Sequence, residues 1–279
     1  MRKTLWIGLA LLVGTLPTLV TQAQEVESKV IDGAYERQRT LNRRVIPYPY
    51  LREADVFWER RVWRDIHVKR NENLYADKMN LIFAYPRRPL SQVLWEAVTS
   101  GEVTAYDILD DEFTTPLTPA EVIARYTKTD TVWSIDPLTG EEVQQIIETT
   151  FQPEYVSKYR LKEDWIFDKQ RSMMYPRIIG ILPYYYEPDK QEAFAMFWLY
   201  YPDLRPILVN EEVFNIKNDS YRPSWDDIFQ SRMFSSVIVK VSNVYDRMIQ
   251  DYLTGLDALY EAERIKNMII DKEQFLWSY

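Results

Sequence analysis

The chain of 279 residues has no Cys, a single His and only seven Gly. Without Cys it has no thiol nucleophile, no thiolate ligand for zinc or an iron–sulfur cluster, no disulfide and no site for lipid attachment. The single histidine, His67, excludes a zinc site built mainly from imidazole. We interpret His67 as a packing or hydrogen-bonding residue.

The glycines that follow residue 23 are scattered, and no two of them lie within seven residues of each other: Gly33, Gly101, Gly140, Gly180 and Gly255. A loop that binds phosphate needs clustered Gly, because only Gly lets the backbone approach the phosphate closely. The sequence therefore excludes a P-loop and a dinucleotide fingerprint. We predict no catalytic residue, no cofactor and no metal site, and we interpret the chain as a protein that works through its surface.

The first 23 residues have the pattern of an export signal. Arg2 and Lys3 precede the apolar stretch 5–20, and Thr21-Gln22-Ala23 supplies small residues at the positions that signal peptidase reads. An uncleaved anchor is the alternative, but the apolar stretch is shorter than the roughly 20 residues that span a bilayer. We predict cleavage between Ala23 and Gln24, which makes residues 1–23 a signal peptide and places the mature protein in an extracytoplasmic space.

Composition indicates a folded and acidic protein. Hydrophobic residues make up 46% and aromatic residues 14% of the chain, which is far from the profile of a disordered protein. There are 34 Lys and Arg, two of them in the signal, against 42 Asp and Glu. The mature chain therefore carries a clear excess of negative charge, which argues against sequence-independent binding of nucleic acid.

Residues 24–54 are predicted to form an extended or disordered arm. The segment is polar, and it contains Pro47-Tyr48-Pro49-Tyr50, in which each Pro biases the preceding residue toward extended geometry. Arms of this kind lie across a neighbouring subunit or stay disordered, and the sequence leaves both open. We predict that the arm becomes ordered only on a neighbour, and its candidate partner-contact residues are Arg43, Arg44, Tyr48 and Tyr50.

Residues 55–279 are predicted to form an α+β body. We interpret 55–67 as a helix because Val62, Trp63 and Ile66 recur at helical spacing, whereas a strand would place Arg60 and Arg64 on the apolar face. Further helices are predicted at 91–98, 119–126, from Ser224 onward and at 245–275. Strands are predicted at 81–85, 103–106, 129–135, 142–150, 178–182, 193–201, 214–216 and 237–241. The sheet is mixed or antiparallel with flanking helices, and the strands at 129–135 and 142–150 form a hairpin that turns at Gly140.

A weak internal similarity accompanies these elements. Pro89 and Pro223 each precede a predicted helix that leads into a strand at the same offset. Two related halves, 55–152 and 153–279, are one interpretation, and chance similarity is the other.

Paired carboxylates are the one catalytic device that this composition permits, since a glycosidase needs only two acidic residues. The candidates are Asp110 with Asp111, Glu163 and Asp164 with Asp168, and Asp226 with Asp227. The sequence does not rank them, and Asp226 and Asp227 also suit the first turn of a helix. A stand-alone secreted binding or carbohydrate-active domain is therefore the alternative function.

Four long strings carry a resemblance to a known family: DVFWERRVWRDI at 55–66, LKEDWIFDKQRS at 161–172, RIIGILP at 177–183 and SWDDIFQSRMFSSVIVKVSN at 224–243. Together they resemble the periplasmic gliding-motility and type IX secretion family called GldN or PorN, found in Bacteroidetes. The resemblance extends from about residue 55 to 260.

This resemblance implies a periplasmic structural subunit and no enzymatic activity. Members of the family are thought to assemble with an outer-membrane lipoprotein (GldK or PorK) and with copies of themselves into a ring that supports protein export across the outer membrane. The periplasmic shaft of the inner-membrane motor (GldM or PorM) is the other implied partner. The resemblance implies no nucleic acid and no membrane span of the chain's own, so attachment to the outer membrane comes through partners.

Overall fold

The structure is a computed structural model, and it describes residues 34, 43–68, 87–109, 111–135, 142–149, 151–187, 190–215, 218 and 220–277. The chain divides into two compact units, Met1–Arg39 and Thr40–Tyr279, and the fold below is that of the second unit. The predicted cleavage site at Ala23 and Gln24, the apolar run 81–85 and the turn at Gly140 lie outside the described residues.

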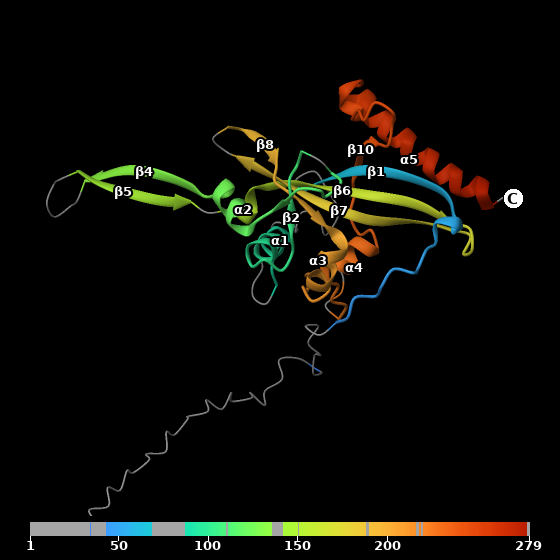
Figure 1. Ribbon diagram of the computed structural model, residues 1–279, viewed down its shortest axis with the longest axis horizontal. Coiled ribbons are helices and arrows are strands. Elements are labelled where there is room, and N and C mark those ends of the chain that lie inside the picture. Colours follow the sequence, from blue (N-terminus) through green and yellow to red (C-terminus); the bar gives the residue numbers. More distant parts are fainter. Residues whose placement is uncertain are drawn as a thin grey trace, which may run out of the picture. The chain divides into compact units, whose positions relative to one another are not determined.

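The predicted α+β class is confirmed. The main sheet has eight antiparallel strands in the order β10-β1-β6-β7-β9-β2-β3, and β8 pairs with β7 (Figure 1). Its strands are β1 (Val56–His67), β2 (Ala105–Tyr106), β3 (Pro116–Leu117), β6 (Val156–Asp168), β7 (Met173–Glu187), β8 (Glu192–Ala195), β9 (Trp198–Tyr200) and β10 (Val237–Val241). The helices are α1 (Leu90–Thr99), α2 (Pro119–Tyr126), α3 (Tyr201–Leu208), α4 (Trp225–Gln230) and α5 (Leu256–Trp277), with short 3-10 turns at Glu53–Asp55, Pro153–Tyr155 and Ile249–Asp251.

The prediction of a helix at 55–67 is wrong, because this segment is strand β1, which lies between β10 and β6 near one edge of the sheet. It pairs with β6 along its whole length and with β10 from Val62 to Asp65. The strand does place Arg60 and Arg64 on the face of Val62, as a period of two requires. These charges are tolerated because counter-charges on neighbouring elements meet them, as shown below for Arg64.

The long strand β6 was not predicted, and its partner β7 was predicted only at 178–182. Together they form the longest hairpin of the sheet, paired from Val156↔Tyr185 to Asp168↔Met173. The predicted strand at 193–201 is split into β8, β9 and the first residue of α3. Pro202 lies in the first turn of α3, where its fixed φ suits a helix start. The predicted strand 103–106 shortens to β2, and Phe214 and Asn215 lie outside any strand.

Three predicted helices are confirmed as α1, α2 and α4, and two of them begin at capping boxes. Thr118 accepts a hydrogen bond from the Glu121 N–H while the Glu121 side chain accepts from the Thr118 N–H. Ser224 and Asp227 do the same for α4. Such reciprocal bonds satisfy two of the four free N–H groups at a helix start, which explains why local sequence predicted these boundaries.

The C-terminal helix begins at Leu256, so the prediction of a helix from residue 245 is wrong for its first turns. The Asn243 side chain holds this stretch in a loop, since it accepts from the Tyr245 and Arg247 N–H groups and donates to the Val241 and Arg247 carbonyls. Gly255 then adopts a φ of 62°, a conformation that favours Gly, and the helix starts after it.

The predicted hairpin is confirmed as strands β4 (Lys128–Ile135) and β5 (Glu142–Thr149). The two pair in register from Lys128↔Thr149 to Ile135↔Glu142 and form a separate two-stranded sheet.

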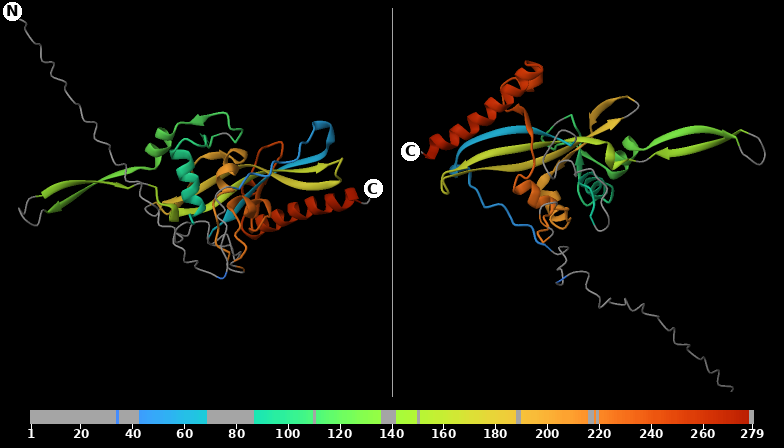
Figure 2. Two further views of the ribbon diagram at one scale, coloured as in Figure 1. Left: turned by 90° about the horizontal axis from the view of Figure 1, so that it is seen from below. Right: turned by 180° about the vertical axis from the view of Figure 1, so that it is seen from behind.

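One face of the main sheet carries two apolar clusters at opposite ends of β1. At the Ile66 end, side chains from β1, β6, β7 and β9 pack against α1, α3 and α4 in the larger cluster, and Tyr159, Leu161 and Trp225 are fully buried there. At the Val62 and Trp58 end, a smaller cluster packs against α5 through Ala262, Ile265 and Ile269. Figures 1 and 2 show α5 and α1 at opposite ends of β1.

The other face of the sheet is covered by a loop instead of a helix. A third cluster there contains Trp63 and Trp198, and Phe113 packs against it from the loop that leads to β3. Phe113 adopts a φ of 61°, and a Cβ on Gly180 would lie 2.6 Å from its ring. Because Gly180 has no side chain, the Phe113 ring can pack closely against the sheet at this position.

Candidate partner-contact site

The end of the predicted arm, residues 43–50, lies against the body of its own chain. The Arg43 guanidinium donates to the Asp227 carboxylate at 2.9 Å and to the Arg222 carbonyl at 3.1 Å. The Arg43 N–H donates to the Asn210 side chain at 3.0 Å. These bonds attach the segment to α4 and to the loops beside it.

Tyr48 is the second attachment point of this segment. Its ring lies under the Arg205 guanidinium at 4.5 Å and near that of Arg177 at 5.5 Å. Its hydroxyl accepts a hydrogen bond from the Gln230 side chain at 2.9 Å. Burial raises the pKa of the Tyr48 phenol above its usual value of 10.0, so the ring stays neutral at physiological pH.

Arg205, which contacts the Tyr48 ring, belongs to a buried ion pair. Arg205 of α3 donates twice to the Asp226 carboxylate of α4, at 3.0 and 3.1 Å, and the Tyr201 hydroxyl donates to the same carboxylate at 2.8 Å. All three side chains are buried. Paired geometry of this kind offsets part of the cost of burying two charges, and it fixes α3 against α4.

The prediction that this arm becomes ordered only on a neighbour is therefore wrong for residues 43–50. Arg43 and Tyr48 are held by their own chain, whereas Arg44 is exposed and Tyr50 is 85% exposed. Arg43 is also exposed, with 38% of its side chain accessible, whereas Tyr48 is half-buried. Residues 24–42 lie outside the description, except residue 34.

A charge cluster that sequence reasoning missed lies on the helix-covered face between the two apolar clusters. Glu163 of β6 is fully buried; it accepts a hydrogen bond from Arg232 at 2.9 Å and forms an ion pair with Arg64 of β1 at 3.2 Å. Both guanidinium groups also lie over the Trp165 ring, that of Arg64 at 5.5 Å and that of Arg232 at 5.3 Å. Burial lowers the pKa of Arg64, and the Glu163 charge opposes that shift.

The opposite face carries a ladder of ion pairs across β1 and β6. Asp65 is buried and accepts from Arg160 at 2.7 Å and from Lys158 at 2.8 Å. Arg61 forms a two-bond pair with Asp164, at 2.6 and 2.8 Å. Further along, the Lys162 ammonium pairs with Asp111 and lies over the Trp63 ring, which the Lys240 ammonium also approaches at 4.3 Å.

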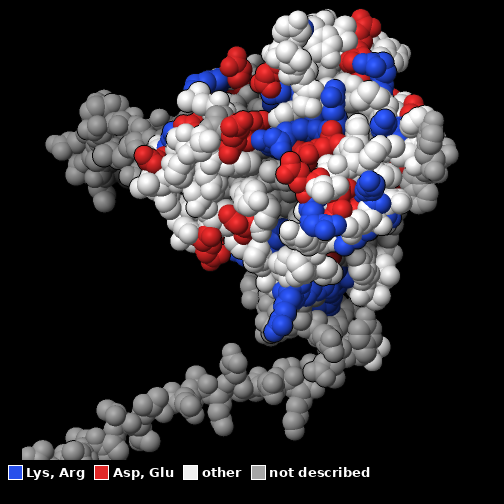
Figure 3. Space-filling model, turned by 45° about the vertical axis from the view of Figure 1, so that its right-hand side comes forward, with Lys and Arg blue, Asp and Glu red and all other residues white. Residues whose placement is uncertain are grey.

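The order of charged residues in the sequence contains a signal for this ladder, which the hydrophobic periodicity did not reveal. The strings RVWRD in β1 and RLKED in β6 carry opposite charges in antiparallel order, so register places Asp65 opposite Arg160 and Arg61 opposite Asp164. Opposite charges at facing positions stabilise a strand pair. On the side of the molecule drawn in Figure 3, Lys and Arg are correspondingly interspersed with Asp and Glu across the upper part of the surface.

The candidate catalytic carboxylates are engaged in these structural contacts. Glu163 and Asp164 are neighbours on β6 that face opposite sides of the sheet, and Asp168 accepts from the N–H groups of the following turn, at Gln170 and Arg171. Asp226 binds Arg205, and Asp227 caps α4. Asp110 lies outside the described residues.

Two features are absent from the described residues. Within these ranges, no group of three or more His, Asp and Glu side chains is arranged to hold a metal ion. No helix in the same part of the chain combines the length and the apolar character that crossing a membrane requires.

The fold and its contacts define an α+β protein whose described charges are largely paired within the chain. The family model of the gliding motility associated protein GldN matches residues 51–278. The chain belongs to the GldN family, a structural family of the secretion machinery, and is a component of the gliding-motility and type IX secretion system. No curated protein sequence matches the chain.

Proposed function

We propose that the mature chain is a periplasmic structural subunit of the type IX secretion and gliding-motility machinery. In this proposal it assembles with copies of itself and with an outer-membrane lipoprotein of the GldK or PorK type into a ring that supports export across the outer membrane. A periplasmic shaft protein of the GldM or PorM type is its second partner.

The match of the GldN family model over residues 51–278 carries this proposal. The sequence adds an N-terminal export pattern with predicted cleavage at Ala23, and it has no Cys for a lipid anchor of its own. The structure adds large exposed side chains of the types that interfaces favour, among them Tyr50, Tyr260 and Phe275. Together these features suit a subunit that is exported and attached through its partners.

Cross-linking of intact cell envelopes, followed by purification of the tagged full-length protein and mass spectrometry, tests this function. We expect the lipoprotein, the shaft protein and copies of the chain itself to be recovered in cross-linked bands. A parallel purification without cross-linker controls for adventitious binding. Recovery of the protein as a monomer that osmotic shock releases, without these partners, would contradict the proposal and favour a stand-alone secreted domain.

A further inference from the structure

Strand β1 has an open edge along its N-terminal half. On one side it pairs with β6 from Val56 to His67. On the other side β10 pairs with it only from Val62 to Asp65, and the Ser242 N–H then donates to the Arg61 carbonyl at 3.0 Å. Among the described strands, none pairs with the outer edge of residues 56–60.

The backbone groups of Glu59 point toward this open edge. The Arg61 carbonyl faces the β10 side, and residues two apart in a strand direct their N–H and C=O groups to the same side. Glu59 therefore presents one donor and one acceptor, and neither has a backbone partner in the described part of the chain. An edge with unpaired groups is a template for the addition of another strand.

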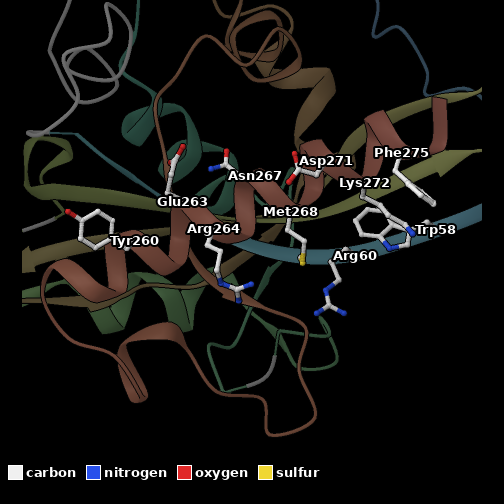
Figure 4. A pocket seen from close by; sticks show the side chains of 10 residues that line it. All are labelled: Trp58, Arg60, Tyr260, Glu263, Arg264, Asn267, Met268, Asp271, Lys272 and Phe275. Carbon is white, nitrogen blue, oxygen red and sulfur yellow. The ribbon is translucent and has the colours of Figure 1, made fainter. Parts of the chain in front are cut away.

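Helix α5 forms a groove with this edge. The groove has a volume of about 1000 Å³, and its lining includes Trp58 and Arg60 from β1 with Met268, Lys272 and Phe275 from α5 (Figure 4). Phe275 is 53% exposed and Met268 is 37% exposed. The open backbone edge thus lies beside an accessible apolar and aromatic wall.

Arg60 gives this groove an unmatched positive charge. Its Nε is buried without a hydrogen-bond partner, and no carboxylate in the described residues lies within ion-pair distance of its guanidinium. The neighbouring Arg61 and Arg64 both have carboxylate partners. Figure 4 shows Asp271 projecting from α5 away from Arg60. Glu263 also lines the groove but pairs with Lys266. The Arg60 guanidinium therefore remains complementary to an acidic side chain of a ligand.

The edge of β1 in a second copy does not supply that acidic group. When two antiparallel edges pair about a two-fold axis, side chains of the same face stay together. On β1 this face carries Trp58, Arg60, Val62 and Arg64, and none of these is acidic. Charge complementarity therefore favours a strand from a different protein.

We propose that the groove between β1 residues 56–60 and α5 receives a short extended segment of a partner protein, which adds to the sheet as a strand. An acidic side chain of the segment pairs with Arg60. A large apolar side chain two residues away, on the same face of the added strand, packs against Trp58 and Phe275. Main-chain hydrogen bonds to Glu59 hold the segment, and the two side chains select it. This surface is independent of the proposed role in secretion.

A peptide-display library that is selected against the whole mature protein tests the proposal. We expect the enriched peptides to share an acidic residue two positions from a large apolar one. Their affinity is then measured by fluorescence polarisation for the wild type, Glu59→Pro and the matched control Glu59→Ala. Pro at this position removes an N–H that has no backbone partner in the described residues, and an edge strand tolerates the proline ring. We therefore expect little change in the melting curve and at least a tenfold loss of affinity. Glu59→Ala keeps that N–H and keeps binding.

A second variant keeps the test decisive if Glu59→Pro disturbs the fold. We expect Arg60→Glu to weaken the selected peptides at least tenfold and to bind peptides in which Lys replaces the acidic residue. Selected peptides without the acidic and apolar pattern, or equal affinity of the wild type and a folded Glu59→Pro, would overturn the proposal. Binding of a synthetic peptide of residues 24–42 at this groove would overturn the assignment to a different protein.

Discussion

The two ends of strand β1 differ in how they are covered. At its C-terminal end Ile66 is fully buried in the cluster under α1, α3 and α4. At its N-terminal end Phe57 is 59% exposed, and no described strand pairs with the outer edge. The buried side chains that α5 contributes to the smaller cluster are Ala262, Ile265 and Ile269.

This difference shows that one strand has two physical roles. The covered end has the dense apolar packing that supplies most of the free energy of folding. The open end exposes aromatic side chains and backbone donors, which cost free energy when they are left unpartnered. Changes at the covered end should therefore affect folding, whereas changes at the open end should affect contacts and leave folding intact.

The largest expected effect is that of Trp225→Ala at the covered end. Trp225 is fully buried and its indole N–H donates to the Arg88 carbonyl, so removal leaves a cavity and should cost about 3–5 kcal/mol. Tyr260→Ala, which removes a ring that is 71% exposed beside the groove, should change stability by less than about 0.5 kcal/mol. Urea unfolding of both variants measures the contrast, and similar losses would contradict it.

Glu163→Gln should have the next largest effect. The substitution keeps the shape of the side chain but leaves the buried Arg64 without a counter-charge, and breaking a buried pair in this way costs about 3 kcal/mol. The control is Glu263→Gln on the exposed face of α5, where the pair with Lys266 at 3.1 Å should contribute less than about 1 kcal/mol. Equal unfolding midpoints for the two variants would show that Glu163 is not a structural anchor.

Acid should weaken the fold partly through Asp65. Burial raises the pKa of this carboxyl, but the hydrogen bonds and charges of Arg160 and Lys158 outweigh burial and hold the pKa below its usual 3.8. Because the folded pKa is lowered, the stabilisation is complete above pH 3.8 and is lost as pH falls through the folded value. Asp65→Asn should lower the free energy of unfolding at neutral pH. The decrease in that free energy between neutral and acidic pH should be smaller for the variant than for the wild type. Parallel curves from pH 7 to pH 3 would refute this role.

The smallest expected effect concerns the segment 43–50. Tyr48→Ala removes one hydrogen bond and the contacts with Arg177 and Arg205, which should cost about 1 kcal/mol. A chain that begins at Leu51 should melt a few degrees below one that begins at Arg43, since about 1 kcal/mol shifts the melting temperature of a chain of this size by roughly 2–4 °C. Identical melting temperatures would show that the segment does not belong to the fold.

Local signals in the sequence predicted the parts of the fold that local interactions determine. The capping box from Thr118 to Glu121 places the start of α2, and strand pattern on both sides of a turn signal places β4 and β5. Strand β1 was wrongly predicted because its charges have partners that are distant in sequence. Arg64 is neutralised by Glu163, so the rule that a buried strand face is apolar does not hold for this pair.

The candidate site was predictable to a similar extent. The sequence indicated that Arg43 and Tyr48 make contacts, but it did not show that Asp227 and Arg205 of the same chain receive them. The open edge of β1 was not predictable at all, because it depends on where β10 ends relative to β1 in three dimensions. A helix assignment for residues 55–67 also removes the edge from consideration.

Hydrogen–deuterium exchange tests the division between the two ends of β1 most directly. The free mature protein is compared with the protein in complex with a selected peptide. We expect the Glu59 amide, which faces the open edge, to exchange fast in the free protein and to become strongly protected in the complex, while α1 and α4 are protected in both. Protection that appears elsewhere on the surface while the Glu59 amide continues to exchange fast would contradict the account.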